Sequence, residues 1–255
     1  GAPIYVKHEI VHNKYVVDEL KEKGVIFIED VKKVPSHSIL IYSAHGVSEE
    51  VIKLSKENNL KVFNATCPLV TKVHMEVYKL AAKNINTILI GHKGHPEVEG
   101  TLGRYNSNSG SKITLIENTK DLDRLNFDED EEIAYVTQTT LSIDDTKNII
   151  ETIKAKYKNV IEPVKGDICY ATQNRQNAVK ELTKTCDIIF VVGSENSSNS
   201  NRLKEISTRA GVPSYLIDGA DDLDIVWVSN KKNIGLTAGA SAPEILIQTI
   251  INKLK

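Results

Sequence analysis

Two cysteines of this 255-residue chain occupy equivalent places in the sequence. Cys67 and Cys169 each lie in a short polar loop before an expected helix. The helices are expected over residues 69–83 and 171–185, and the apolar strands that follow them over 87–90 and 188–192. Each strand is followed by a glycine, Gly91 or Gly193, that lies 24 residues after the cysteine. A thiol at a helix N-terminus is held as thiolate by the helix dipole, which suits metal ligation or nucleophilic attack. A lone cysteine is more often a small buried residue, but two in equivalent positions favour metal ligation.

Polar side chains follow both glycines at the same spacing. His95 and Ser197 lie four residues after them, and Glu97 and Asn199 lie six residues after them. The first loop brings imidazoles and carboxylates into one turn, which suits oxyanion binding and proton transfer. The second loop, which includes Ser198, is dense in hydroxyl and amide donors that can bind an anion before a helix. A solvated charged turn and a Ser/Asn linker are the alternatives, but the matching positions favour a shared site.

The cysteine spacing also limits the kind of metal centre. Zinc sites use close ligand pairs such as Cys-x-x-Cys, which this chain lacks. Single cysteines from separate units fit an iron–sulfur cluster better, and three thiolates on four irons leave one iron open to substrate. The remaining cysteine, Cys186, lies at a helix-to-strand junction, where we predict a packing role.

Further strands repeat along the chain. Three stretches are typical of strands that end in an acid, at residues 24–30, 112–118 and 213–219. After each of them another strand breaks into a polar loop, and these loops contain His45, Thr139 and Ser241. Strands that alternate with helices in three similar units predict an α/β fold with largely parallel sheets in a pseudo-threefold arrangement. Ligands of such sheets bind beyond the carboxyl ends of the strands, where these loops lie.

The repeat also sets the expected domain boundaries. We expect a first α/β unit over residues 1–67, a second over 68–165 and a third over 166–255. If the repeat is regular, the cysteine that matches Cys67 in the first unit is expected roughly twenty residues before Gly1. The polar run 106–111 is expected to form a surface turn and not a linker.

Composition and hydropathy exclude several classes of protein. A net charge of -2 provides no basic face for nucleic acid. No apolar stretch approaches the ~18 residues that span a bilayer, and no secretory signal opens the chain. Three widely spaced cysteines do not form a disulfide framework, so we expect a soluble protein of the reducing cytoplasm.

One motif favours a different function. The run from His8 to His12 matches HExxH, in which two histidines on one helical face bind zinc beside a glutamate base. Residues 3–6 before it are typical of a strand, so His8 is expected at a strand end and not within a helix. A zinc peptidase is therefore an alternative that the context disfavours.

Taken together, the motifs resemble those of the LytB family, the 4-hydroxy-3-methylbut-2-enyl diphosphate reductases of the non-mevalonate isoprenoid pathway. The resemblance covers the whole chain and rests on the motifs at residues 64–70, 92–100, 137–140, 169–172 and 193–202. It implies three α/β domains around a central cleft and a four-iron, four-sulfur (4Fe–4S) cluster with three cysteine ligands. Cys67 and Cys169 match two of these ligands, and the third belongs to a motif upstream of Gly1.

The resemblance also implies roles for individual residues. Glu97, with His95 in the same loop, matches the essential acid that delivers protons, and Thr139 matches the residue that positions the hydroxyl end of the substrate. The diphosphate is expected to bind His12, His45, His95, Ser197, Ser198, Asn199 and Ser241. The implied reaction removes the allylic hydroxyl with two electrons from a donor such as ferredoxin or flavodoxin, and it yields isopentenyl or dimethylallyl diphosphate.

A protein that binds the diphosphate without a cluster is the remaining alternative. It is motivated by the chain's two matching cysteines, where the family uses three. Iron content after anaerobic reconstitution distinguishes this alternative from the reductase, and zinc without iron would favour the peptidase.

Overall fold

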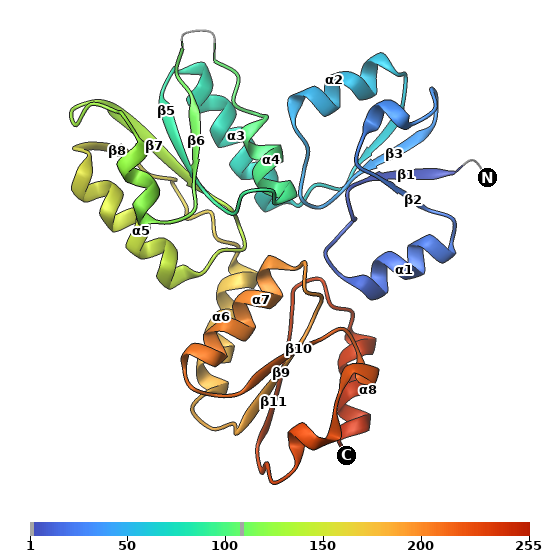
Figure 1. Cartoon of the computed structure of the whole chain (residues 1–255). Helices are drawn as coiled ribbons and strands as arrows, with labels where there is room; N and C mark the ends of the chain where they lie inside the picture. The colour runs from blue at the N-terminus through green and yellow to red at the C-terminus, as the bar shows by residue number, and fades with distance from the viewer. Residues whose placement is uncertain (1–2, 108–109) are drawn as a thin grey trace. The chain divides into compact units, whose positions relative to one another are not determined.

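The computed structural model describes residues 3–107 and 110–255, and within these ranges strands alternate with helices along the chain (Figure 1). The strands form three sheets, and neighbouring strands in all three run parallel. The predicted α/β fold class with parallel sheets is confirmed. The predicted turn at 106–111 includes residues 108 and 109, which lie outside the described residues.

The three sheets share one strand order. The first, β2-β1-β3-β4, contains β1 (Ile4–Lys7), β2 (Ile26–Ile28), β3 (Ile39–Tyr42) and β4 (Lys61–Asn64). The second, β6-β5-β7-β8, contains β5 (Asn86–Ile90), β6 (Ile113–Ile116), β7 (Glu132–Thr137) and β8 (Asn159–Ile161). The third, β10-β9-β11, contains β9 (Ile188–Val192), β10 (Ser214–Ile217) and β11 (Ile234–Ala238). In each sheet the second strand lies on one side of the first and the third on the other, so the sequence repeat is a repeat of topology.

The described residues form eight α-helices, of which the first seven lie between strands and the last follows β11. They are α1 (Lys14–Glu22), α2 (Glu49–Glu57), α3 (Pro68–Ala82), α4 (Pro96–Leu102), α5 (Ile143–Lys156), α6 (Tyr170–Leu182), α7 (Ser198–Arg209) and α8 (Glu244–Leu254). Short 3-10 helices follow the acid-ended strands: η1 (Val31–Lys33), η2 (Thr119–Arg124), η3 (Ala220–Asp222) and η4 (Ile225–Val228). None of the helices in the described ranges is both long enough and apolar enough to cross a membrane.

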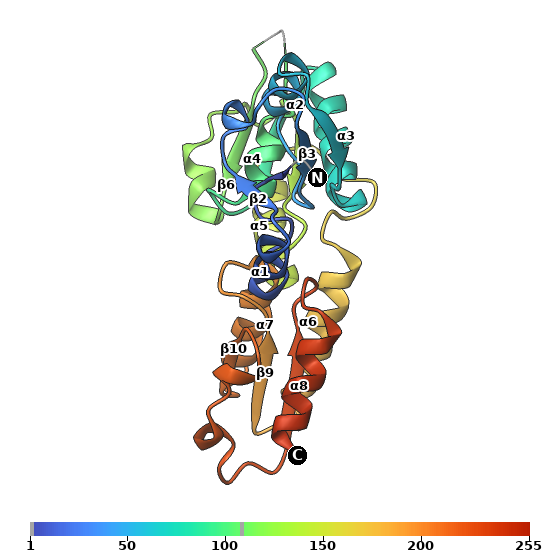
Figure 2. The same cartoon turned by 90° about the vertical axis from the view of Figure 1, so that its right-hand side faces the viewer.

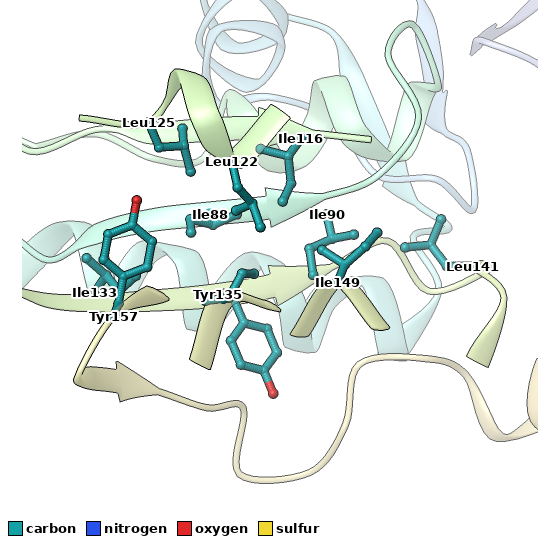
Figure 3. Packing of buried hydrophobic residues seen from close by; sticks show 11 residues of the cluster. Ile88, Ile90, Ile116, Leu122, Leu125, Ile133, Tyr135, Leu141, Ile149 and Tyr157 are labelled. Carbon is teal, nitrogen blue, oxygen red and sulfur yellow. The ribbon is translucent and has the colours of Figure 1, made fainter. Parts of the chain in front are cut away.

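The core of the second sheet follows the two-residue period of its strands. Ile88 and Ile90 of β5 pack on one face with residues of η2 and α5, as Figure 3 shows, while Leu89 packs on the other face with α3. Burial of apolar side chains on both faces explains why β5 is a continuous apolar run. In the third sheet Phe190 faces α8, which lies along the sheet in Figure 2, and Ile189 faces α6 and α7.

By its contacts the chain forms two compact units. The first contains residues 1–10 and 24–168, with the first and second sheets, and the second contains residues 11–23 and 169–255, with the third sheet. Helix α1 thus belongs with the C-terminal part of the chain, although it lies between β1 and β2 in sequence. The boundaries after residues 67 and 165 stay predictions.

The acid-ended strands each hold the loop that follows the first strand of their sheet. Glu29 after β2 contacts the Nδ1 atom of His8 at 2.6 Å, and Glu117 after β6 accepts a hydrogen bond from the backbone N of Lys93 at 2.9 Å. In the third sheet Asp218 accepts a hydrogen bond from the Ser194 hydroxyl. The three acids therefore have a structural role, because each one binds the loop at the carboxyl edge of its sheet.

The HExxH alternative lacks the local structure that it requires. His8 follows β1 with a positive φ of 60°, and residues 3–13, before α1 begins at Lys14, contain no helix. On a helix, residues four positions apart lie one turn apart on the same face and can bind one metal ion, whereas in an extended chain they lie more than ~10 Å apart. The segment from His8 to His12 is therefore unlike the zinc-binding helix of a peptidase.

Candidate active site

Both predicted metal ligands directly precede a helix. Cys67 is the N-cap of α3 and Cys169 is the N-cap of α6, with φ/ψ of -55°/133° and -57°/133°. Neither side chain makes a cap hydrogen bond, both residues are partly exposed, and both are free thiols. This repeated geometry places two thiols at the positive ends of helix dipoles, which suits thiolate coordination. Within residues 3–107 and 110–255, no three His, Cys, Asp or Glu side chains form a complete metal-binding group.

A buried acid faces the loop after β7. Glu97, in the first turn of α4, is only 3% exposed. Its Oε1 accepts a hydrogen bond from the backbone N of Thr139 at 2.7 Å, and its Oε2 lies 2.9 Å from the Thr139 Oγ1. Burial raises the pKa of Glu97 to about 7, against the hydrogen bonds from Thr139, which lower it; the Asp167 carboxylate adds to the rise. A carboxyl group with this pKa can hold and release a proton at neutral pH, as a general acid must.

Two histidines lie beside this acid's helix. His95 is the N-cap of α4, and its Nδ1 accepts a hydrogen bond from the backbone N of Glu97 at 3.2 Å. A neutral imidazole that accepts at Nδ1 carries its proton on Nε2, so His95 can donate from its other nitrogen. The ring of His45 lies edge-on to that of His95, with ring centroids 5.7 Å apart. Cys67 is tied to the same loop, because its backbone N donates to the Ala44 carbonyl at 3.0 Å.

The loop that carries His45 rests on a third histidine. Gly46 has a φ of +76°, and a Cβ at this position would meet His74 Cε1 at 2.5 Å. His74 is 5% exposed, and its burial lowers its pKa to about 4. The ring is therefore neutral at pH 7 and packs under the loop without a buried charge.

Asn199 has in α7 the place that Glu97 has in α4. It is the second residue of its helix and is 5% exposed, and neither its Oδ1 nor its Nδ2 finds a hydrogen-bond partner among the described residues. The N-cap of α7, Ser197, accepts hydrogen bonds from the backbone N and the Oγ of Ser200 at 3.3 and 3.0 Å. Buried polar groups are nearly always paired, so an unpaired amide at a helix N-terminus indicates a place for a ligand.

The N-terminus of α1 contacts the same loops of the second unit. The Ser241 hydroxyl donates to the carbonyl of His12 at 2.9 Å. Ser194, after β9, accepts a hydrogen bond from the backbone N of Lys14 at 2.8 Å. The segment that carries His12 is therefore bound to the loops after β9 and β11, and these contacts join residues 180 and 229 positions apart in sequence.

Two glycines let these loops approach α7 closely. A Cβ added at Gly193 or at Gly239 would meet the Ser200 Oγ at 2.2 Å. Ser200 is fully buried, so neither position accepts a larger residue without displacing α7.

The structure also identifies polar residues that the sequence reasoning missed. Gln138 is 1% exposed; its Oε1 accepts from the backbone N of His92 at 2.9 Å and its Nε2 donates to Thr140 Oγ1 at 2.9 Å. Gln138 joins the loops after β5 and β7. Its position next to Thr139 in the sequence was the signal that could have identified it. Asp167 is 4% exposed, and its position two residues before Cys169 was the available signal.

The predicted site residues thus fall into two groups. The first unit contains His45, Cys67, His95, Glu97 and Thr139. The second unit contains His12, Cys169, Ser197, Ser198, Asn199 and Ser241. Hydrogen bonds or ring contacts join several members within each group. Their functional roles stay predictions.

Comparison with known proteins agrees with these features. The family model for the LytB protein matches residues 1–255. A 4-hydroxy-3-methylbut-2-enyl diphosphate reductase from Saccharophagus degradans is 56% identical over 255 residues, which are 100% of this chain and 82% of that protein. The protein of the same name from Histophilus somni is 57% identical over 255 residues, 100% of this chain and 81% of its own length.

Solved structures show the same similarity. The E-1-hydroxy-2-methyl-but-2-enyl-4-diphosphate reductase from Plasmodium falciparum matches with a TM-score of 0.93 and 44% identity, over 98% of this chain and 78% of that one. A second structure, of an (E)-4-hydroxy-3-methyl-but-2-enyl diphosphate reductase, matches with a TM-score of 0.69 and 32% identity, over 98% of this chain and 87% of that one. The family resemblance that the motifs indicated is confirmed.

Proposed function

Because the chain belongs to the LytB family, we propose that it removes the allylic hydroxyl of 4-hydroxy-3-methylbut-2-enyl diphosphate. The products are isopentenyl and dimethylallyl diphosphate, and the reaction is the last step of the non-mevalonate isoprenoid pathway. The balanced change adds two electrons and two protons to the substrate and releases one water.

The buried pair of Glu97 and Thr139 is the observation that carries this proposal. Loss of a hydroxyl group needs a proton, since hydroxide is a poor leaving group. Glu97, with a pKa of about 7, holds that proton at neutral pH and can give it to the departing oxygen. The Thr139 hydroxyl, 2.9 Å from Glu97 Oε2, can orient the hydroxyl end of the substrate beside the acid.

Diphosphate binding is the role we propose for the histidines and for the polar loops of the second unit. The Nε2 atom of His95 donates to a phosphate oxygen, and His45 and His12 add further imidazole donors. The unpaired amide of Asn199, with the hydroxyls of Ser197 and Ser198, supplies neutral donors at the N-terminus of α7. The Ser241 hydroxyl joins them by turning its proton from the His12 carbonyl to the ligand. Together these groups can bind the negative charge of the substrate.

The repeated geometry of Cys67 and Cys169 fits the iron–sulfur chemistry of the family. We propose that both thiolates hold a 4Fe–4S cluster. When bound, this cluster would supply the two electrons and a Lewis-acidic iron for the substrate oxygen. An electron donor of the ferredoxin or flavodoxin type is implied, and a cytoplasmic location fits the three free cysteines.

The test is direct. Protein reconstituted anaerobically with iron and sulfide is mixed with 4-hydroxy-3-methylbut-2-enyl diphosphate and a one-electron reductant, and the two products are quantified. We expect product formation that is lost in Cys169→Ser together with the bound iron. Diphosphate binding with neither iron nor product in the parent protein would instead support the cluster-less alternative.

A further inference from the structure

The chain reaches its two ligand cysteines by different routes. Cys67 follows β4 after two residues, and the backbone N of Ala65 and of Cys67 donate to carbonyls of the neighbouring β3 and its loop. Between β8 and Cys169, residues 162–168 form no helix or strand. This connection is exposed at residues 164–166 and then buried at Asp167.

A lysine on α3 holds this connection. The Lys72 Nζ atom lies 2.8 Å from Asp167 Oδ1, donates to the Lys165 carbonyl and lies 3.4 Å from that of Gly166. The other oxygen of Asp167, Oδ2, accepts a hydrogen bond from the backbone N of Thr137 at 2.9 Å. One carboxylate therefore joins three segments, namely α3, the end of β7 and the connection that leads to Cys169.

The two side chains of this pair are buried to different extents. The Asp167 side chain is 0% exposed and that of Lys72 is 33% exposed. Without the cation, the buried Asp167 carboxylate keeps only the backbone N of Thr137 as a partner, which is far more costly than the loss of an exposed ion pair. The flanking exposed stretch has no regular hydrogen-bonded structure of its own, so it opens readily once its anchor is removed.

We infer that Lys72 and Asp167 form a clamp of two positioning residues, which holds the chain before Cys169 against the helix that Cys67 begins. The same carboxylate binds Thr137, two residues before Thr139, which orients the proton donor. The clamp thus supports both the approach to a cluster cysteine and the loop that holds Glu97. That the clamp helps to hold an iron–sulfur cluster rests on the proposed function.

Limited trypsinolysis of the cluster-free protein tests the clamp without any activity. Trypsin cleaves after Lys165, within the held stretch, and mass spectrometry follows this one bond. We expect Lys72→Met to speed the cleavage about tenfold and Asp167→Asn to speed it less, because the amide can still accept from Thr137. The double variant is expected to behave like the worse single variant, since both residues serve one contact.

Matched controls separate the clamp from general loosening. Lys154→Met removes an ion pair of 2.7 Å to Glu162, at the start of the same connection, but both side chains are largely exposed. We expect this variant to cleave at the parent rate. Lys72→Arg keeps a cation in reach of Asp167, so it should restore slow cleavage even if Lys72→Met folds poorly.

A second measurement connects the clamp to the cluster. Iron release to a chelator after anaerobic reconstitution should be about tenfold faster in Lys72→Met than in the parent and in Lys154→Met. Equal cleavage at Lys165 in parent and Lys72→Met overturns the clamp, and faster cleavage with unchanged iron release overturns its role for the cluster. A parent protein that takes up no iron counts against the proposed function, while the cleavage comparison still decides on the clamp.

Discussion

Helices α4 and α7 begin at equivalent points of two repeated units, but the side chains of their second residues differ in hydrogen bonding. Glu97 of α4 is buried with both oxygens hydrogen-bonded to Thr139, whereas Asn199 of α7 is equally buried with both polar atoms unpaired in the described structure. The Glu97 carboxyl is thus enclosed by its partner Thr139, whereas the Asn199 amide has polar atoms that a bound ligand could pair. Under the proposed function, this repeated scaffold carries proton transfer at Glu97 and anion binding at Asn199. The difference arises because the residue at this position decides whether its polar atoms are paired within the protein.

The largest effect is expected for Glu97→Gln. The amide keeps the shape of the side chain but cannot supply a proton, so turnover should fall by about 10²- to 10⁴-fold while diphosphate binding changes little. Single-turnover product formation and calorimetric titration of the substrate measure the two properties. The matched control is Glu99→Gln, which changes an exposed carboxyl on the same helix and should leave turnover near that of the parent. Near-parental turnover in Glu97→Gln would show that the proton comes from another group.

The raised pKa of Glu97 also predicts how stability depends on pH. The carboxyl stays protonated in the folded protein up to about pH 7 but ionises near pH 4.5 in the unfolded chain. Between these values the unfolded state binds fewer protons, so stability falls as pH rises, by ~3 kcal/mol in total, and levels off above pH 7. Glu97→Gln lacks this loss and should be more stable relative to the parent at pH 8 than at pH 5. Thermal unfolding curves that shift in parallel at both pH values would contradict the raised pKa.

Asn199→Ala should weaken diphosphate binding but leave the stability of the free protein nearly unchanged, whereas loss of a structural residue lowers stability. Removal of an unpaired buried amide costs the free protein little, but the lost donor should weaken diphosphate binding by about 1–3 kcal/mol. Asn201, two residues after Asn199 on α7, donates to the carbonyls of Glu195 and Ser197. Its replacement by Ala should lower the free energy of unfolding by about 1 kcal/mol. Calorimetry with inorganic diphosphate and denaturant unfolding distinguish the two; a large loss of stability in Asn199→Ala would mean that its amide is paired.

The smallest effect is expected away from both helix N-termini, at Cys186. Its sulfur lies 3.9 Å from Thr185 Oγ1, and a Cβ at Gly235 would meet it at 3.1 Å, so it packs at the edge of the third sheet. Cys186→Ser should change iron content and turnover by less than about twofold, since surface-proximal swaps of similar size cost little. Iron analysis of Cys186→Ser beside Cys169→Ser provides the comparison. A comparable loss of iron in both would make Cys186 a ligand.

Much of this architecture was open to prediction from local patterns. Strand β9 has the predicted bounds, β5 begins one residue earlier than predicted, and α3 and α6 lie within three residues of the expected helices at either end. Apolar runs between turn residues specify strands, and polar residues before a helix specify its cap, because both depend on neighbours in sequence. The spacing of Cys67 and Cys169 was informative for the same reason: their loops repeat one local conformation.

The sequence by itself therefore determined the repeated α/β units, the two cysteines before their helices and the candidate acid and anion-binding loops. Only the tertiary structure decided that Glu97 is closed against Thr139 while Asn199 is unpaired, and that α1 packs with the C-terminal unit. It also brought Lys72 to Asp167 across 95 residues of sequence. Burial and hydrogen bonding depend on residues far apart in the chain. These long-range contacts therefore determine the pKa of the Glu97 carboxyl and whether the Asn199 amide has a hydrogen-bond partner.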